Sequence, residues 1–140
     1  MKQDLSRFIT AQHFTYEQVL LELKQGCKRS HWMWFIFPQF CGLGYSDRTR
    51  FYAIKSVEEA RAYVQDSLLG ERLVECAGLL LEIEGKTVRD IFESPDDLKL
   101  QSSMTLFTSV SELEIFDKVL ERYFEGKKDQ RTLELMGGGV

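Results

Sequence analysis

The sequence is poor in the residues that build metal sites, disulfide frameworks and many-turned β proteins. It has two histidines, two prolines, and three cysteines without a C-x-x-C pair in 140 residues. Zinc sites and disulfide scaffolds need such ligands at closer spacing, so we expect no metal and no other cofactor. Few prolines, and glycines placed mainly where segments end, favour helices joined by short loops. Free thiols fit a reducing cytoplasm.

Long hydrophobic runs are also missing. No apolar run approaches the roughly 20 residues that span a bilayer, and residues 1–7 contain no apolar stretch of signal-peptide type. With 44% hydrophobic and 29% charged residues, the chain is expected to form one globular domain over residues 1–136, followed by a flexible glycine tail over 137–140. We therefore expect a cytoplasmic protein without membrane contact.

Positive charge is scarce overall but concentrated in one segment. The formal net charge is −4, which argues against general nucleic-acid binding by the whole surface. Residues 24–55 nevertheless carry a net charge of +5, which leaves −9 for the rest of the chain. A basic third in an acidic chain suggests an anionic small-molecule partner. The alternative is a solvated basic face that pairs with the acidic remainder.

The spacing of apolar residues predicts a mainly α fold of about six to eight helices in a single compact domain. A Thr or Ser three residues before Gln or Glu marks two helix starts, at Thr15 and Ser56. A short extended segment is expected near residues 48–54. The helices and helical turns are expected at 4–12, 16–25, 31–37, 57–67, 71–84, 88–92, 96–107, 112–125 and 133–136.

The segment Trp32–Phe37 contains both tryptophans and no polar residue, so its periodicity cannot separate helix from strand. Ser30 can cap a helix and Pro38 would end one, so a short buried helix is favoured. We call residues 32–37 the aromatic segment.

The residues around the aromatic segment form the first candidate site. Backbone N–H groups at the start of a helix, beside the cations Lys28 and Arg29, would attract an anion. The indoles of Trp32 and Trp34 could provide a flat wall for a ring, although both could simply be core residues. The candidate ligand-binding residues are Lys28, Arg29, Ser30, Trp32, Trp34, Gln39, Lys99 and Ser102.

The second candidate site lies in residues 96–103. Its acids fit the first turn of an exposed, capped helix, which is the plainer interpretation. If this helix face meets the aromatic segment, however, a carboxylate would lie beside a basic pocket. Such a carboxylate could act as a general base or stabilise an oxocarbenium-like sugar during N-glycosidic cleavage. The candidate catalytic residues are Asp97 and His31.

Several segments resemble one known family. They are K-R-S-H-W-M-W-F-I-F-P-Q (28–39), G-L-G (42–44), Y-A-I (52–54), E-A-R-A-Y (59–63), L-G-E-R-L-V-E-C (69–76) and P-D-D-L-K-L-Q-S-S-M-T-L-F (95–107). They resemble the bacterial domain-of-unknown-function family DUF1810, often mislabelled calpastatin. Members usually carry Arg where this chain has Gln101, which puts an anion contact from that position in doubt. The resemblance suggests remote kinship to a helical family associated with NAD and ADP-ribose, some of whose members are N-glycosidases.

Two functions follow as hypotheses, and the sequence leaves open whether the protein is an enzyme. The first is binding or hydrolysis of a phosphorylated, nucleotide-like small molecule. The second is a non-enzymatic protein-interaction module, or a homodimer, that uses a Trp-rich surface. Joint exposure of Trp34 and Phe37 would favour the second hypothesis.

Overall fold

A computed structural model describes residues 3–137 of the chain. Over these residues the protein is mainly helical, as predicted, but it has ten helices rather than six to eight. Of the four helices of four to six residues, those at 33–36, 88–92 and 130–135 overlap expected helices or helical turns, whereas the one at 47–52 was expected to be extended. The helices are α1 (Ser6–His13), α2 (Tyr16–Gln25), α3 (Met33–Ile36), α4 (Asp47–Tyr52), α5 (Val57–Gln65), α6 (Leu69–Glu82), α7 (Val88–Phe92), α8 (Asp96–Val110), α9 (Ile115–Phe124) and α10 (Gln130–Leu135).

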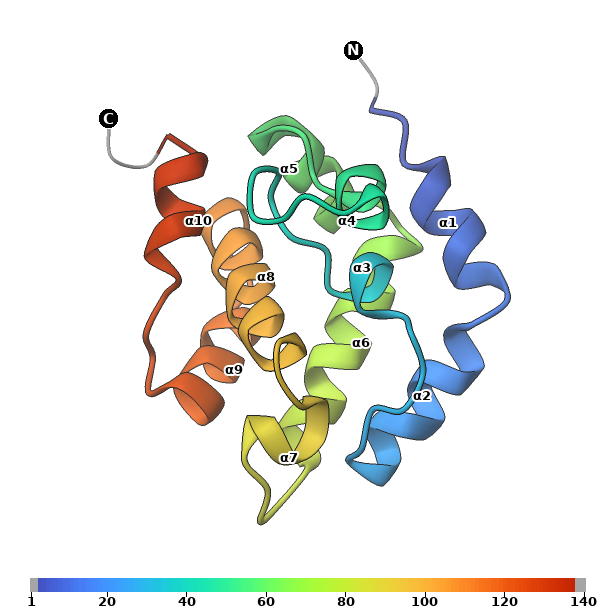
Figure 1. Cartoon of the computed structure of the whole chain (residues 1–140), viewed down its shortest axis with the longest axis vertical. Coiled ribbons are helices and arrows are strands. Elements are labelled where there is room, and N and C mark those ends of the chain that lie inside the picture. The colour runs from blue at the N-terminus through green and yellow to red at the C-terminus, as the bar shows by residue number, and fades with distance from the viewer. Residues whose placement is uncertain (1–2, 138–140) are drawn as a thin grey trace.

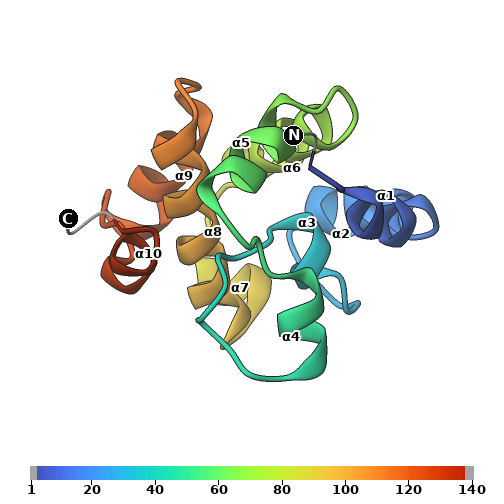
Figure 2. The same cartoon turned by 90° about the horizontal axis from the view of Figure 1, so that it is seen from above.

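Helices α6 and α8 form the middle of the molecule (Figure 1). Both α5 and α9 pack against this pair, α2 packs against α6, and α7 and α10 pack against α8. Helices α3 and α4 contact each other, and α3 also contacts α1. Viewed from above, α9 and α10 lie on the opposite side of the molecule from α1 (Figure 2). No helix of the described part is long and apolar enough to cross a membrane. The expected glycine tail lies outside the described residues, apart from Gly137.

The aromatic segment forms the short helix α3, as predicted. Trp32 is 1% exposed and Phe37 is completely buried, and both belong to the hydrophobic core. Trp34 is only partly buried and packs against the edge of this core. The segment therefore acts mainly in folding, with one indole near the surface.

The expected extended segment near residues 48–54 is instead mostly helix. The Ser46 hydroxyl accepts a hydrogen bond from the Thr49 N–H at 3.1 Å, which caps the start of α4. Extended pairing is limited to a parallel bridge between Phe40 and Ile54. In this bridge the Cys41 N–H donates to the Ile54 carbonyl at 2.9 Å, and the Ile54 N–H donates to the Gln39 carbonyl at 2.8 Å.

Gly70 allows α5 and α6 to approach closely. A Cβ at this position would lie 2.0 Å from the Val64 carbonyl oxygen, far inside contact distance. Gly70 is buried in the first turn of α6, and Val64 lies near the end of α5. The absence of a side chain therefore sets the path of the chain between these two helices.

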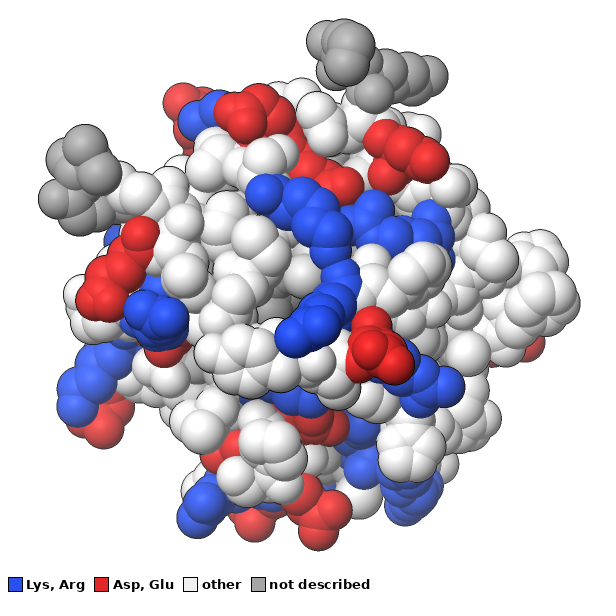
Figure 3. Space-filling view, turned by 45° about the horizontal axis from the view of Figure 1, so that its top comes forward, with Lys and Arg blue, Asp and Glu red and all other residues white. Residues whose placement is uncertain are grey.

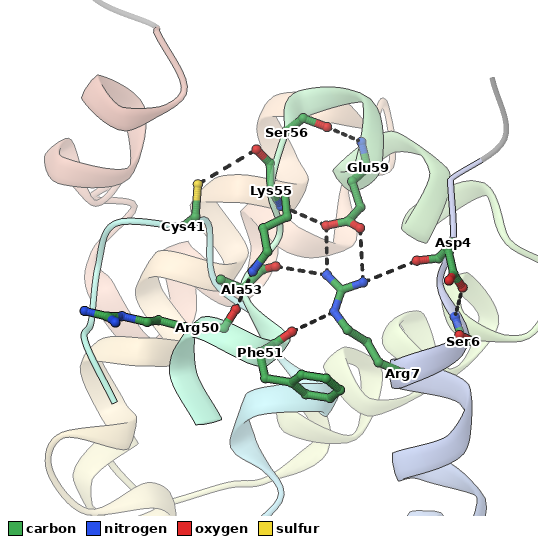
Figure 4. Close-up of polar contacts among 10 residues, drawn as sticks. All are labelled: Asp4, Ser6, Arg7, Cys41, Arg50, Phe51, Ala53, Lys55, Ser56 and Glu59. Atoms are coloured by element: carbon green, nitrogen blue, oxygen red, sulfur yellow. Dashed lines mark hydrogen bonds and ion pairs between the residues drawn. The ribbon is translucent and has the colours of Figure 1, made fainter. Parts of the chain in front are cut away.

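Arg7 connects α1 to the segment that joins α4 and α5 (Figure 4). Its guanidinium donates to both carboxylate oxygens of Glu59, at 2.9 and 3.1 Å. It also donates to the carbonyls of Phe51 and Ala53, at 2.8 and 2.9 Å. The side chains of Arg7 and Glu59 are 15% and 7% exposed. This ion pair is thus largely shielded from water.

Arg7→Ala is expected to lower the free energy of unfolding by about 3 kcal/mol, because it leaves a buried carboxylate without its cation. Arg61→Ala, on the exposed face of α5, should change it by less than about 0.5 kcal/mol. Urea unfolding of both variants provides the comparison. Equal losses of unfolding free energy in the two variants would mean that the buried Arg7–Glu59 pair does not contribute to stability.

Candidate functional site

The start of α8 meets the aromatic segment, so the two candidate regions of the sequence come together. The Lys28 Nζ lies 2.9 Å from Asp96 Oδ2 and 5.2 Å from the centre of the Trp32 ring. The Lys99 Nζ lies 3.6 Å from Asp96 Oδ1 and 5.1 Å from the centre of the Trp34 ring. The carboxylate at this junction therefore belongs to Asp96.

A pocket of about 340 Å³ opens beside this junction. Its walls come from the chain around residues 39–49, the first turns of α8, and the residue before α10. They combine one cation, one carboxylate, an amide and two hydroxyls with apolar side chains, a mixture typical of small-molecule sites. We call it the Lys99 pocket; it is lined by Gln39, Leu43, Gly44, Thr49, Pro95, Leu98, Lys99, Ser102 and Asp129.

A second cation, Arg48, contacts the same Trp34 ring as Lys99, although neither Arg48 nor Trp34 lines the pocket. The Arg48 guanidinium carbon lies 5.0 Å from the centre of the Trp34 ring, almost the same distance as Lys99 Nζ. Both contacts are within range for cation–π attraction. Figure 3 shows Lys and Arg side chains gathered across the middle of one face of the molecule.

The charge beside the Lys99 pocket is not balanced locally. Among residues 3–137, no ion pair includes Arg48. Lys99 shares Asp96 with Lys28, and Asp96 lies closer to Lys28. With Asp129 of the pocket wall counted, the carboxylates of Asp96 and Asp129 face three cations, Lys28, Lys99 and Arg48, which leaves one positive charge for an anion.

Three predicted ligand-binding residues are occupied by contacts within the protein. The Lys28 side chain is 8% exposed and also donates to the Ser30 carbonyl at 2.6 Å. The Arg29 guanidinium donates to the Gln25 side chain at 2.6 Å. The Ser30 hydroxyl donates to Glu22 at 2.6 Å. The polar groups of these three side chains thus have partners within the protein, and no ligand is needed to explain their positions.

Glu22, which the sequence reasoning missed, organises the chain before the aromatic segment. Its buried carboxylate accepts hydrogen bonds from the N–H groups of Arg29 and Ser30, the Ser30 hydroxyl and the Trp32 indole. Burial alone raises the pKa of Glu22. The hydrogen bonds from Ser30, Arg29 and Gln18 outweigh burial and lower this pKa to about 2. The indole of Trp32 therefore stabilises the fold through Glu22 and is not available to a ligand.

The two candidate catalytic residues are not brought together at the Lys99 pocket. Asp97 is 6% exposed; its Oδ2 lies 3.4 Å from the Arg89 Nε, and its Oδ1 has no partner among the described residues. His31 is exposed and forms no hydrogen bond or ion pair with Asp97. Neither residue lines the pocket. The predicted residues that do line it are Gln39, Lys99 and Ser102.

Asp129 and Thr49 line the pocket and were also missed. Asp129 Oδ2 accepts from the Ser102 hydroxyl at 3.2 Å and caps α10 by accepting from the Thr132 N–H at 3.0 Å. The Asp-x-x-Thr spacing could have identified this cap, but only the fold brings it next to α8. Thr49 donates its N–H to the cap of α4.

A larger hollow of about 600 Å³ lies between α1 and α5 and fits an anion less well. Its lining includes the acids Asp4 and Asp66 and no cation. A cluster of metal-binding side chains is not found among residues 3–137. Of these two hollows, the Lys99 pocket is the better candidate site for an anion.

The fold and the pocket describe a small, mainly helical protein with cations beside a pocket of mixed polar and apolar lining. The family model described as "Protein of unknown function (DUF1810)" matches residues 2–136, and the chain belongs to this family. The crystal structure of the conserved hypothetical protein Rv1873 from Mycobacterium tuberculosis is similar, with a TM-score of 0.94 and 49% identity over 96% of each chain. No curated protein matches the chain. The family expected from the sequence is confirmed.

Proposed function

We propose that the protein binds a phosphorylated, nucleotide-like small molecule in the Lys99 pocket. The observation that carries this proposal is the pair of cations, Lys99 in the pocket wall and Arg48, each about 5 Å from the centre of the same Trp34 ring. A phosphate beside them would meet positive charge that Asp96 and Asp129 do not fully neutralise. The amide of Gln39 and the hydroxyls of Thr49 and Ser102 suit the polar atoms of a sugar.

Binding of a nucleotide panel by calorimetry tests the proposal. The panel is AMP, GMP, CMP, UMP, ADP-ribose and ribose 5-phosphate. Lys99→Gln is expected to weaken the tightest of these at least about tenfold, because a desolvated charge-assisted contact is lost. Lys118→Gln, which removes the same charge from the exposed face of α9, should leave the affinity within about twofold. Intrinsic fluorescence provides a second readout, since Trp34 lies beside both cations.

Failure of every member of the panel to bind would overturn the proposal, as would equal effects of the two lysine variants. Chromatography of the incubated nucleotides would show whether free base is released. Such release would extend the function to N-glycosidic cleavage. Such cleavage would need a carboxylate near the sugar, and Asp129 is the acid that lines the pocket.

The structure does not favour the interaction module built on a Trp-rich surface. Joint exposure of Trp34 and Phe37 would have favoured that hypothesis, but Phe37 is completely buried. The remaining exposed part of Trp34 lies beside two cations rather than in an apolar patch.

A further inference from the structure

The ring of a nucleotide-like ligand needs a flat partner, and the aromatic segment does not offer a free one. Trp32 is 1% exposed, and its indole N–H is bound to Glu22. Phe37 is completely buried. Trp34 has two cations over its ring and supports them instead of a base. Any ring-binding side chain must therefore come from another segment.

Tyr45 is the exposed aromatic residue next to the pocket wall. It lies between Gly44, which lines the Lys99 pocket, and Ser46, which caps α4. Tyr45 is 76% exposed, so its aromatic surface is available to a ligand, and its chain neighbour Gly44 lines the pocket. Leu98 also lines the pocket and is 58% exposed, which adds an apolar surface on α8.

Two glycines set the path of the loop that carries Tyr45. Gly42 has φ +100°, which most other residues adopt only with strain. A Cβ on Gly44 would lie 2.7 Å from Thr49 Cγ2, so the glycine lets the loop pack against α4. Within residues 3–137, the Tyr45 ring makes no aromatic or cation–π contact that would fix it elsewhere.

We infer that Tyr45 is the ring-binding residue of this site: the phosphate lies between Lys99 and Arg48, and the base stacks at the rim on Tyr45 beside Leu98. The inference rests on the proposed function. It specifies the ligand as a nucleoside phosphate whose phosphate contacts the two cations and whose base contacts Tyr45. Aromatic stacking tolerates any base, because every base has a π face. Stacking on Tyr45 would then give the nucleotide a higher affinity than ribose 5-phosphate, whereas the two cations would contribute to the binding of both molecules.

The test compares Tyr45→Ala, Tyr45→Phe and Phe14→Ala by calorimetry, with ribose 5-phosphate and the tightest nucleoside monophosphate as probes. Tyr45→Ala should weaken the nucleotide about tenfold, as expected for the loss of one stacked base, and change ribose 5-phosphate by less than about twofold. Tyr45→Phe should restore nucleotide affinity, because stacking does not require the hydroxyl. Phe14→Ala is the matched control, since Phe14 is 86% exposed and lies between α1 and α2.

The outcomes distinguish the anion site from ring binding by Tyr45. If the wild-type protein binds ribose 5-phosphate as tightly as every nucleotide, or if Tyr45→Ala weakens both probes equally, Tyr45 does not bind a ring, although the anion site stands. If neither probe binds the wild-type protein, the proposed function and this inference both fail. Thermal unfolding of the Tyr45 variants should match the wild type, since the replaced side chain is exposed.

Discussion

Alanine at position 70 is expected to lower the free energy of unfolding by at least about 3 kcal/mol, as measured by urea denaturation. The new Cβ would lie 2.0 Å from the Val64 carbonyl oxygen and 2.9 Å from its carbonyl carbon. Both atoms belong to the backbone, so no side-chain rotation relieves the overlap. Helices α5 and α6 must move apart, and residues they bury, including Tyr63 and Leu73, would lose contacts.

Gly78→Ala is the matched control because it introduces the same methyl group in the same helix. At position 78 the nearest atom to the new Cβ is Ile115 Cδ1, at an ordinary contact distance of 3.8 Å. Alanine is the better helix former, so this variant should gain up to about 1 kcal/mol. The two changes should therefore have opposite signs. A Gly70→Ala variant as stable as Gly78→Ala would show that the close approach of α5 and α6 is not required.

Glu22→Gln is expected to remove about 3 kcal/mol of stability at neutral pH, and the loss should shrink in acid. The folded-state pKa of about 2 lies below the ordinary value of 4.5, so the ionised carboxylate stabilises the fold above about pH 5. This contribution disappears as pH falls towards 2 and Glu22 becomes protonated. Urea unfolding at several pH values should show wild-type and variant curves that converge at low pH.

Glu17→Gln provides the control on the same helix. Glu17 is exposed in the first turn of α2, and its replacement should cost less than about 0.5 kcal/mol. A difference between Glu22→Gln and wild type that stays constant from pH 6 to pH 2 would contradict the role assigned to the Glu22 carboxylate.

Most of the longer helices could be predicted from sequence because they bury an apolar stripe that repeats with the helical period. Helix α6 shows this well, with Leu73, Cys76, Ala77 and Leu80 all buried. Helix α8 is the exception, since it buries all of residues 102–107, and its start signal at residues 94–97 predicted it instead. The short helices could not be predicted in the same way. For α4, the decisive feature is the cap at Ser46 rather than a stripe, and none of its residues is buried. The Thr15 cap expected at the start of α2 is absent, because its hydroxyl donates to the Ala11 carbonyl.

The candidate site was only partly predictable, because it depends on how distant segments meet. The sequence singled out Lys99, Ser102 and Gln39, which line one pocket in the structure. It could not decide which of the adjacent acids Asp96 and Asp97 faces the cations, since successive residues of a helix point about 100° apart. It also gave no sign that Glu22 would take up the donors of Arg29 and Ser30, as this requires α2 to lie alongside them.

The bridge between Phe40 and Ile54 divides the protein into parts that should open at different rates. Its two hydrogen bonds close a loop, residues 41–53, that carries Leu43, Gly44 and Thr49 of the pocket wall. In an amide hydrogen-exchange experiment the bonded N–H groups of Cys41 and Ile54 would mark the boundary of the protected helical body. Within that boundary α4 is held by the Arg7 hydrogen bonds to the Phe51 and Ala53 carbonyls. The part before α4, which carries Leu43 and Gly44, is therefore expected to exchange first, so the pocket wall should open locally at little cost in global stability.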